Sequence, residues 1–244
     1  MLDIINKTKI DYRPKLHFTP KENWINDPNG LVYFDGEWHL FFQYNPFGDE
    51  WGHMHWGHAV SKDLLNWEEL PIAIHEDDKN MIFSGSCVID WNNSSGLGYG
   101  INPPMIAIYT DCAQDFSNQS QGIAYSLDKG RTFTKYSGNP VLDIGQKDFR
   151  DPKVFWHEDS QKWIMVIANS KENKISIYNS SNLINWDFQS YFGPAGCDGK
   201  LWECPDLFAL KVAESDEIKW VLKVDIFERE FERYSMAQIF IGDF

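Results

Sequence analysis

The 244-residue sequence predicts an all-β protein built as a β-propeller, and three observations lead to this prediction. Short segments of alternating or continuous apolar residues dominate the chain, with turn-forming residues between them. Aromatic residues make up 16% of the chain, which suits many short strands that pack on both faces. Two sequence patterns also recur at intervals typical of propeller blades. A β-sandwich with accidental internal similarity is the alternative.

Most of the apolar segments have the pattern of strands. The run at 163–168 is apolar on both faces, as expected of a strand between two layers. The segment 225–236 differs, because Phe227, Phe231 and Tyr234 recur at helical spacing among charged residues, and we expect a short amphipathic helix there. The predicted strands are 31–34, 37–44, 105–110, 153–156, 162–168, 175–178, 206–210 and 219–224.

The first repeat is a strand, a polar turn and an aromatic residue that opens the next strand. It reads AVSKDLLNW at 59–67, YSLDKGRTF at 125–133 and YNSSNLINW at 178–186. Its serines are Ser61, Ser126 and Ser180, so the intervals are 65 and 54 residues. A unit of this length made mostly of strand matches a four-stranded blade better than a solenoid turn.

The second repeat begins at Asp27-Pro28, at Asp151-Pro152 and at Glu203-Cys204-Pro205, and each copy leads into a strand hairpin. A single Asp-Pro is usually a turn, but three acidic residues at matching repeat positions need another reason. The inner strands of a propeller surround its axis. We therefore expect Asp27, Asp151 and Glu203 to meet in one pocket.

Carboxylates held close together push at least one pKa upward, which leaves a protonated acid beside an ionised group. Glycosidic cleavage needs this pairing, since one carboxylic acid protonates the leaving oxygen while a carboxylate attacks the anomeric carbon. The repeat therefore points to glycoside hydrolysis.

Three segments carry a resemblance to a known family: WINDPNG at 24–30, FRDP at 149–152 and WECPD at 202–206. They resemble the signature motifs of the glycoside hydrolase family 32 β-fructosidases, which include invertases, levanases and inulinases. FSGS at 83–86 is a fourth match, and the resemblance runs from His17 to the end of the chain. It implies a five-bladed propeller, with residues 1–16 as a lead-in and 17–244 as the catalytic domain.

The resemblance also implies roles for individual residues. Asp27 corresponds to the nucleophile, Glu203 to the acid/base and Asp151 to the transition-state stabiliser. A fructosyl unit would be transferred to Asp27 and released by water with retained configuration, for which carboxyl groups about 5–5.5 Å apart are typical. Arg150 has the forked donors to hold a carboxylate in place. The residues implied to line the sugar subsite are Asn26, Gln43, Trp51, Phe83, Ser84 and Arg150.

The implied activity is release of terminal β-D-fructofuranosyl units from levan, inulin and sucrose, without a cofactor. Segments 52–61 and 90–96 are similar to those of exo-acting fructan hydrolases, and we expect both to form loops at the pocket mouth. A sucrose-preferring invertase is an alternative, and hydrolysis is favoured over fructosyl transfer.

The composition excludes several other classes. With 22 basic against 36 acidic residues the formal charge is −14, which disfavours nucleic acid and anionic membranes as partners. The longest apolar run has six residues, too few to span a membrane. The first residues lack the apolar core of a secretion signal, so we expect a cytoplasmic protein, or a secreted one whose leader has been removed.

The histidines and the cysteines could form sites of other kinds. His53, His55 and His58 resemble a metal cluster, but no acidic or thiol ligand lies near them in sequence, and we expect no metal. Cys87, Cys112, Cys197 and Cys204 form no CxxC pair, so we expect reduced thiols, with a Cys197–Cys204 bridge as the alternative.

The sequence departs from its family in one respect, because it stops in what looks like a fourth blade, without a fifth blade or a C-terminal β-sandwich. An incomplete propeller exposes strand edges, so self-association is expected. A truncated, catalytically inactive propeller that only binds sugars is therefore the alternative to an active enzyme.

Overall fold

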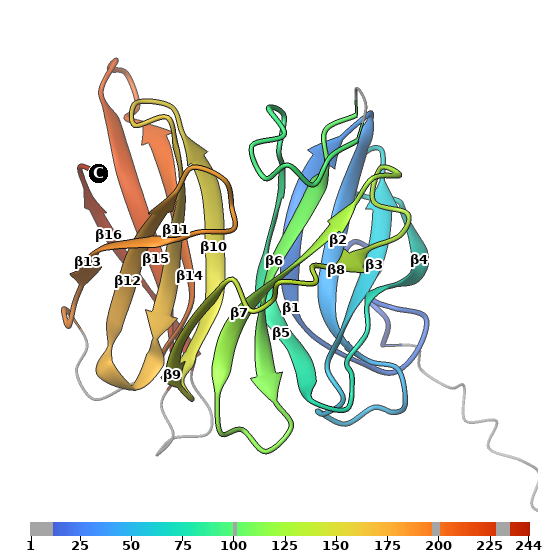
Figure 1. Cartoon of the computed structure of the whole chain (residues 1–244). Coiled ribbons are helices and arrows are strands. Elements are labelled where there is room, and N and C mark those ends of the chain that lie inside the picture. The colour runs from blue at the N-terminus through green and yellow to red at the C-terminus, as the bar shows by residue number, and fades with distance from the viewer. Residues whose placement is uncertain (1–11, 100–101, 197–200, 228–234) are drawn as a thin grey trace, which may run out of the picture.

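The computed structural model describes residues 12–99, 102–196, 201–227 and 235–244, and within them it is a β-propeller (Figure 1). The strands of these residues form four antiparallel sheets, which we number as blades. In each blade the strands follow one another in sequence order, and the first strands, β1, β5, β10 and β14, contact one another in turn. The predicted all-β propeller is confirmed, and every predicted strand lies within an observed one.

The first blade comprises β1 (Trp24–Phe34), β2 (Glu37–Asn45), β3 (His55–Ser61) and β4 (Trp67–Ile74). The second comprises β5 (Asn80–Ile89), β6 (Met105–Ala113), β7 (Gln119–Ser126) and β8 (Thr134–Lys135), with β9 (Leu142–Gln146) also paired to β7. The third comprises β10 (Phe149–His157), β11 (Lys162–Asn169), β12 (Lys174–Ser180) and β13 (Asp187–Phe192), with a 3₁₀ turn at Ser170–Glu172. The fourth, in the described residues, comprises β14 (Leu201–Lys211), β15 (Ile218–Phe227) and β16 (Ser235–Gly242).

The predicted helix at 225–236 is wrong at both ends. Asp225 lies in β15, and Met236 lies in β16, while residues 228–234 are outside the described ranges. Val224 and Ile226 are buried on alternate positions of β15, so the two-residue period of a strand governs the end of β15. Phe231 and Tyr234, two of the three aromatic residues behind the predicted helix, lie outside the described residues.

The first sequence repeat is a recurring hydrogen-bonded turn after the third strand of a blade. In the first blade the Leu64 N–H donates to Ser61 Oγ at 2.9 Å, and the Trp67 indole N–H donates to the Leu64 carbonyl at 3.2 Å. In the third blade Leu183 and Trp186 make the same bonds, to Ser180 Oγ at 2.9 Å and to the Leu183 carbonyl at 3.1 Å.

In the second blade the corresponding serine, Ser126, accepts from the Gly130 N–H at 2.8 Å. The three serines are buried, so each hydroxyl satisfies backbone groups that water does not reach. The sequence repeat thus reflects the same local bonding in successive blades.

Each inner strand contains a break in its pairing. The register between first and second strands shifts between Ile25 and Pro28 in β1, Phe83 and Gly85 in β5, Arg150 and Lys153 in β10, and Glu203 and Asp206 in β14. Proline lacks the N–H that a ladder requires, which accounts for the break in β1, β10 and β14. Such a bulge changes the direction of the side chains beside it.

Apolar side chains fill the spaces between adjacent blades. Phe41, Trp56 and Tyr109 pack between the first and second blades, and Ile108, Phe149 and Met165 between the second and third. Val166 and Trp202 pack between the third and fourth. β11 contributes to two of these layers with alternate residues, as predicted for the run at 163–168. Among the described residues, none forms a helix with the length and hydrophobicity that a membrane crossing requires.

The cysteines do not act as cross-links in the described ranges. Cys87, Cys112 and Cys204 are free thiols, and burial raises the pKa of Cys87 and that of Cys112. Cys197 lies outside the described residues, and the free thiol of Cys204 is at odds with a bridge between the two.

A buried histidine pair lies inside the first blade. His39 Nδ1 and His58 Nε2 are 3.0 Å apart, and the His58 ring stacks on Phe41 with centroids at 4.4 Å. Burial lowers the pKa of His39 to about 4 and that of His58 to about 3. Both rings are therefore neutral at neutral pH.

We expect this pair to make the fold acid-sensitive. Because the folded pKa values lie below those of the unfolded chain, each histidine costs stability as the pH falls below about 6.5, by about 3 kcal/mol at pH 4. His58→Gln should flatten the dependence of the free energy of unfolding on pH between 6.5 and 4. Urea unfolding of the variant and the parent across this range measures the difference. Parallel curves would contradict the assignment.

Candidate active site

One cavity of about 460 Å³ is lined by all nine residues that the sequence singled out. They come from four blades: Asn26 and Asp27 from β1, Gln43 from β2, Phe83 and Ser84 from β5, Arg150 and Asp151 from β10, and Glu203 from β14, with Trp51 from the loop before β3. Residues up to 177 positions apart therefore surround one hollow.

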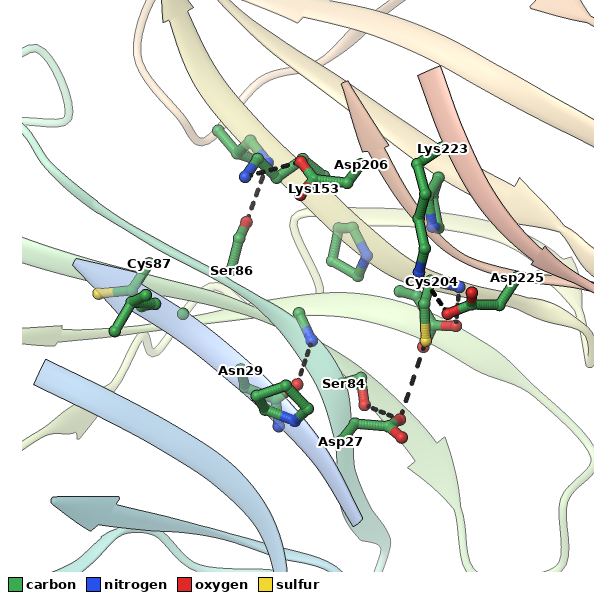
Figure 2. A pocket seen from close by; sticks show the side chains of 18 of the residues that line it. Asp27, Asn29, Ser84, Ser86, Cys87, Lys153, Cys204, Asp206, Lys223 and Asp225 are labelled. Atoms are coloured by element: carbon green, nitrogen blue, oxygen red, sulfur yellow. Dashed lines mark hydrogen bonds and ion pairs between the residues drawn. The ribbon is translucent and has the colours of Figure 1, made fainter. Parts of the chain in front are cut away.

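Asp27 is held through one of its two oxygens. The Ser84 hydroxyl donates to Asp27 Oδ2 at 2.7 Å, and Cys204 Sγ lies 3.9 Å from the same atom (Figure 2). Because both contacts fall on Oδ2, the other oxygen remains available to a ligand in the cavity.

Glu203 is held by Arg150. The guanidinium Nη2 and Nε donate to Glu203 Oε1 at 2.6 and 3.2 Å. Arg150 Nη1 donates in turn to Gln119 at 3.2 Å and to Asp148 at 3.3 Å, and Asp148 pairs with Lys171 at 2.7 Å. Burial lowers the pKa of Arg150, but the charges of Asp151 and Glu203 outweigh burial and raise it. The arginine is thus a fixed cation that orients Glu203.

Asp151 is the most buried of the three acids, at 8% exposed. Its own N–H donates to the Thr110 hydroxyl at 3.1 Å, and its Oδ2 accepts from the Cys204 N–H at 2.9 Å. Its φ of 65° is in the left-handed region, where a non-glycine residue is strained. These bonds fix the carboxyl in the floor of the cavity.

Burial raises the pKa of Asp151 to about 7. The charges of Glu203 and Asp27 push it in the same direction, while that of Arg150 opposes them. A cluster of carboxyls was expected to raise at least one pKa. The pKa that rises is that of Asp151, the acid that burial affects most.

Two residues that were not predicted from the sequence also line the cavity. Cys204 precedes Pro205 as Asp27 and Asp151 precede their prolines, so aligning the three motifs on proline would have found it. Asp225 lies directly opposite Glu203 in the pairing of β15 with β14. The sequence does not point to Asp225, because the spacing of the aromatic residues at 225–236 predicts a helix there.

Gln43 offers an unused donor to the cavity. It is 2% exposed, and its Nε2 has no hydrogen-bond partner among the described residues. An unpaired buried amide is costly, which a ligand hydroxyl would relieve. The neighbouring Asn26 has its Oδ1 occupied by the Trp24 indole N–H at 2.7 Å, so its amide nitrogen is the group left for a ligand.

An aromatic group closes one side of the cavity. The Trp51 and Phe83 rings lie edge to face with centroids 6.0 Å apart, and Trp51 is 49% exposed. Trp51 also stacks on Phe116 at 6.1 Å. A flat ring beside several polar groups is suited to the mixed surface of a sugar.

A second cavity of about 530 Å³ adjoins the first, and Figure 2 shows side chains that line it, among them Asn29, Lys153 and Asp206. The two share Asp27, Ser84, Asp151, Cys204 and Asp225. Ion pairs lie along its wall, between Lys153 and Asp206 at 2.9 Å and between Lys223 and Asp225. The two cavities together form a channel along the inner strands, with the acidic site at one end.

The expectation for segments 52–61 and 90–96 is only partly met. Residues 52–54 adjoin Trp51, but His55–Ser61 is the fully buried strand β3. Segment 90–96 follows the far end of β5, seven residues beyond Ser84 at Trp91, which is roughly 20 Å away along a strand. Placing it at the same mouth as the acidic residues was wrong, because β5 runs along the whole channel.

The histidines of the first blade have other partners. His53 Nδ1 lies 2.8 Å from Glu76, His55 contacts the His53 carbonyl, and His58 pairs with His39. In the described part of the chain no group of three or more His, Cys, Asp or Glu side chains is arranged to hold a metal ion.

Comparison with known proteins shows to which family the chain belongs. The model of the glycosyl hydrolases family 32 N-terminal domain matches residues 17–244. The chain belongs to glycoside hydrolase family 32. The matched range includes the three segments, 24–30, 149–152 and 202–206, whose acidic residues surround the cavity.

Several family 32 proteins are similar over nearly all of the chain. The levanase of Bacillus subtilis is 54% identical over 237 residues, which cover 96% of this chain and 34% of that protein. The extracellular exo-inulinase of Aspergillus awamori is 46% identical over 86% of this chain and 44% of its own length. The chain thus spans between a third and a half of these relatives.

Solved structures agree with the fold. A β-fructofuranosidase from Schwanniomyces occidentalis, complexed with fructosyl-erythritol, superposes with a TM-score of 0.89 at 49% identity. The match covers 95% of this chain and 46% of that one. The family 32 propeller is therefore the fold of this chain.

We expect Asp151 to make stability depend on pH in the direction opposite to the histidine pair. Its folded pKa of about 7 lies above the unfolded value of about 3.9, so stability is present at low pH and is lost as the pH rises through 7. The loss is up to about 4 kcal/mol, and Asp151→Asn should abolish it. Urea unfolding of both proteins at pH 4.5 and 8 measures this. A variant that gains no stability relative to the parent at pH 8 would disprove the shift.

Proposed function

We propose that the chain carries the catalytic site of a retaining β-fructosidase that releases terminal β-D-fructofuranosyl units from levan, inulin and sucrose. The observation that carries the proposal is the meeting of Asp27, Asp151 and Glu203 around one cavity, each with a different set of partners. Those partners separate the tasks of the three acids.

In the first step an oxygen of Asp27 attacks C2 of the fructosyl unit. The bond from C2 to the leaving oxygen breaks, and that oxygen keeps the electron pair and takes a proton from Glu203. In the second step Glu203 takes a proton from water, whose oxygen attacks C2, and the carboxylate of Asp27 leaves. The product is fructose with its configuration retained.

The partners of the acids support these roles. Arg150 holds Glu203 by one oxygen at the cavity wall, which leaves Oε2 for proton transfer. Asp151 is fixed deeper, where its carboxyl can accept hydrogen bonds from two vicinal sugar hydroxyls. Gln43 and Asn26 supply amide donors, and Trp51 supplies a ring face.

The substrate class rests on the relatives. A levanase, an exo-inulinase and invertases are all between 45% and 54% identical to this chain. Levan, inulin and sucrose share a terminal fructofuranosyl unit, which the cavity would hold in the same way. A sucrose-preferring invertase is the narrower form of the same proposal.

Fructose release from levan, inulin and sucrose tests the proposal. We expect the chain to release fructose, Asp27→Ala to lower kcat by at least a thousandfold, and Glu203→Gln to lower it by about a hundredfold or more. Ser117→Ala, an exposed change on the β6–β7 loop, is the matched control. Mass spectrometry of a quenched reaction should find one fructosyl unit on Asp27.

A second candidate is a propeller that binds fructosides without turnover, favoured by the three strands of the fourth blade in the described residues. It predicts binding of fructose by the chain and no release, with release restored when a further blade is supplied. Absence of release from the extended chain as well would refute the hydrolase proposal.

We also propose that the chain associates with a second copy through the fourth blade. β16 is an edge strand in the described sheet, and Ile239 and Ile241 on it are 60% and 70% exposed. Unpaired backbone beside apolar side chains favours pairing with another chain. We expect sedimentation to show dimers that dissociate on dilution, and Ile239→Lys with Ile241→Lys to shift the equilibrium to monomer. Monomers at every concentration would rule this out.

A further inference from the structure

A third cavity, of about 550 Å³, lies at the opposite end of the channel from the acidic site. It is lined by the last residues of β1, β5 and β10 and by the loop after β5. It shares Cys87, Lys153 and Val154 with the channel cavity but no residue with the acidic cavity. It is therefore separate from the proposed active site, and its size is within the range of ligand pockets.

Trp91 is the most exposed aromatic residue of this cavity. It is 68% exposed, although its ring packs edge to face against the buried Phe34, with centroids 5.7 Å apart. Most of the indole surface is thus open to solvent, which costs hydrophobic free energy unless a ligand covers it.

The loop that carries Trp91 is rigidly bonded. The buried Asp90 accepts hydrogen bonds from the Ser94 N–H and the Ser95 N–H, both at 2.8 Å. Asn93 Oδ1 accepts from the Gly98 N–H at 2.7 Å, and the Trp163 indole N–H donates to Ser94 Oγ at 2.9 Å from the third blade. The position of the exposed indole is therefore set before any ligand arrives, which reduces the entropy cost of binding.

Further rings line the other sides. Tyr33, from the end of β1, is 52% exposed and packs on Trp38 at 5.0 Å. Trp156, from the end of β10, packs against Trp163 at 5.2 Å. Rings from three blades thus border one cleft, and the exposed Asn92 is a neutral polar group of its lining.

The charged groups of the cleft are already engaged. Lys153 pairs with Asp206 at 2.9 Å, both oxygens of Asp90 accept from the loop, and Glu158 accepts from Gln161 at 3.1 Å. With a net charge of −14 over the chain, an anionic ligand has nothing to attract it. A neutral ligand with both apolar faces and hydroxyl groups matches a cleft that combines open rings with a neutral amide side chain, that of Asn92.

We propose that this cleft is a second, non-catalytic binding site for a neutral carbohydrate chain, whose sugar rings stack on Trp91 and Tyr33. The site goes beyond the proposed hydrolysis, since none of its residues lines the acidic cavity. A polysaccharide held there would remain near the enzyme between cleavage events, which raises its effective concentration at the acidic site.

Affinity electrophoresis in gels that contain levan, inulin or dextran tests this site. Every protein carries Asp27→Ala, so that no polymer is degraded during the run. We expect at least one polymer to retard the parent, and Trp91→Ala to weaken binding about tenfold. Trp91 is 68% exposed, so most of the surface that the substitution removes lies outside the core. Tyr191→Ala, which removes an aromatic side chain of β13 that is 53% exposed, is the matched control and should bind as the parent does.

The outcomes separate this site from the acidic one. Retardation that Trp91→Ala removes, and that excess free fructose and Trp51→Ala both leave in place, supports the second site even if the chain releases no fructose from any substrate. Retardation that Trp51→Ala removes and Trp91→Ala does not would overturn it. Absence of retardation by all three polymers would also overturn it.

Discussion

The break in strand pairing near the start of every inner strand is the constraint on which the site depends. In a regular strand, consecutive side chains point to opposite faces, so only every second residue would reach the axis. At the four breaks, two consecutive residues line the same cavity: Asn26 with Asp27, Phe83 with Ser84, Arg150 with Asp151, and Glu203 with Cys204. Left-handed backbone at Asp151 and Cys204 accompanies two of them. The inner strands thereby present twice as many functional groups to the cavity as regular strands would.

The same geometry explains how three acids coexist in a small volume. Each is neutralised or bonded differently: Glu203 by the arginine next to Asp151 in sequence, Asp27 by a hydroxyl, and Asp151 by a backbone N–H of the neighbouring blade. The last bond runs from the Cys204 N–H, so the position of one acidic motif is coupled to that of another. A shift of the fourth blade relative to the third would disturb both Asp151 and Glu203.

Much of this arrangement could be predicted from the sequence, because it depends on local patterns that repeat. The alternation of apolar residues located eight of the strands in the described residues, and the recurrence of acid before proline located three of the site residues. The prediction failed at 225–236, where helical spacing of aromatic residues suggested a helix, but Asp225–Phe227 belongs to β15 and Ser235–Met236 to β16. It also failed for Trp91, since sequence proximity to a motif does not reveal at which end of a long strand a loop emerges. Contacts between blades, such as Thr110 with Asp151, depend on packing that no local pattern encodes.

Aligned on their prolines, the three motifs place Asn26, Arg150 and Glu203 at one equivalent position, and Asp27, Asp151 and Cys204 at the next. An amide, a cation and an acid therefore occupy equivalent positions of similar inner strands. A change of chemistry at this site requires no change of backbone. A substitution at one of these positions alters the distribution of charge around the axis, while the neighbouring blades keep their shape.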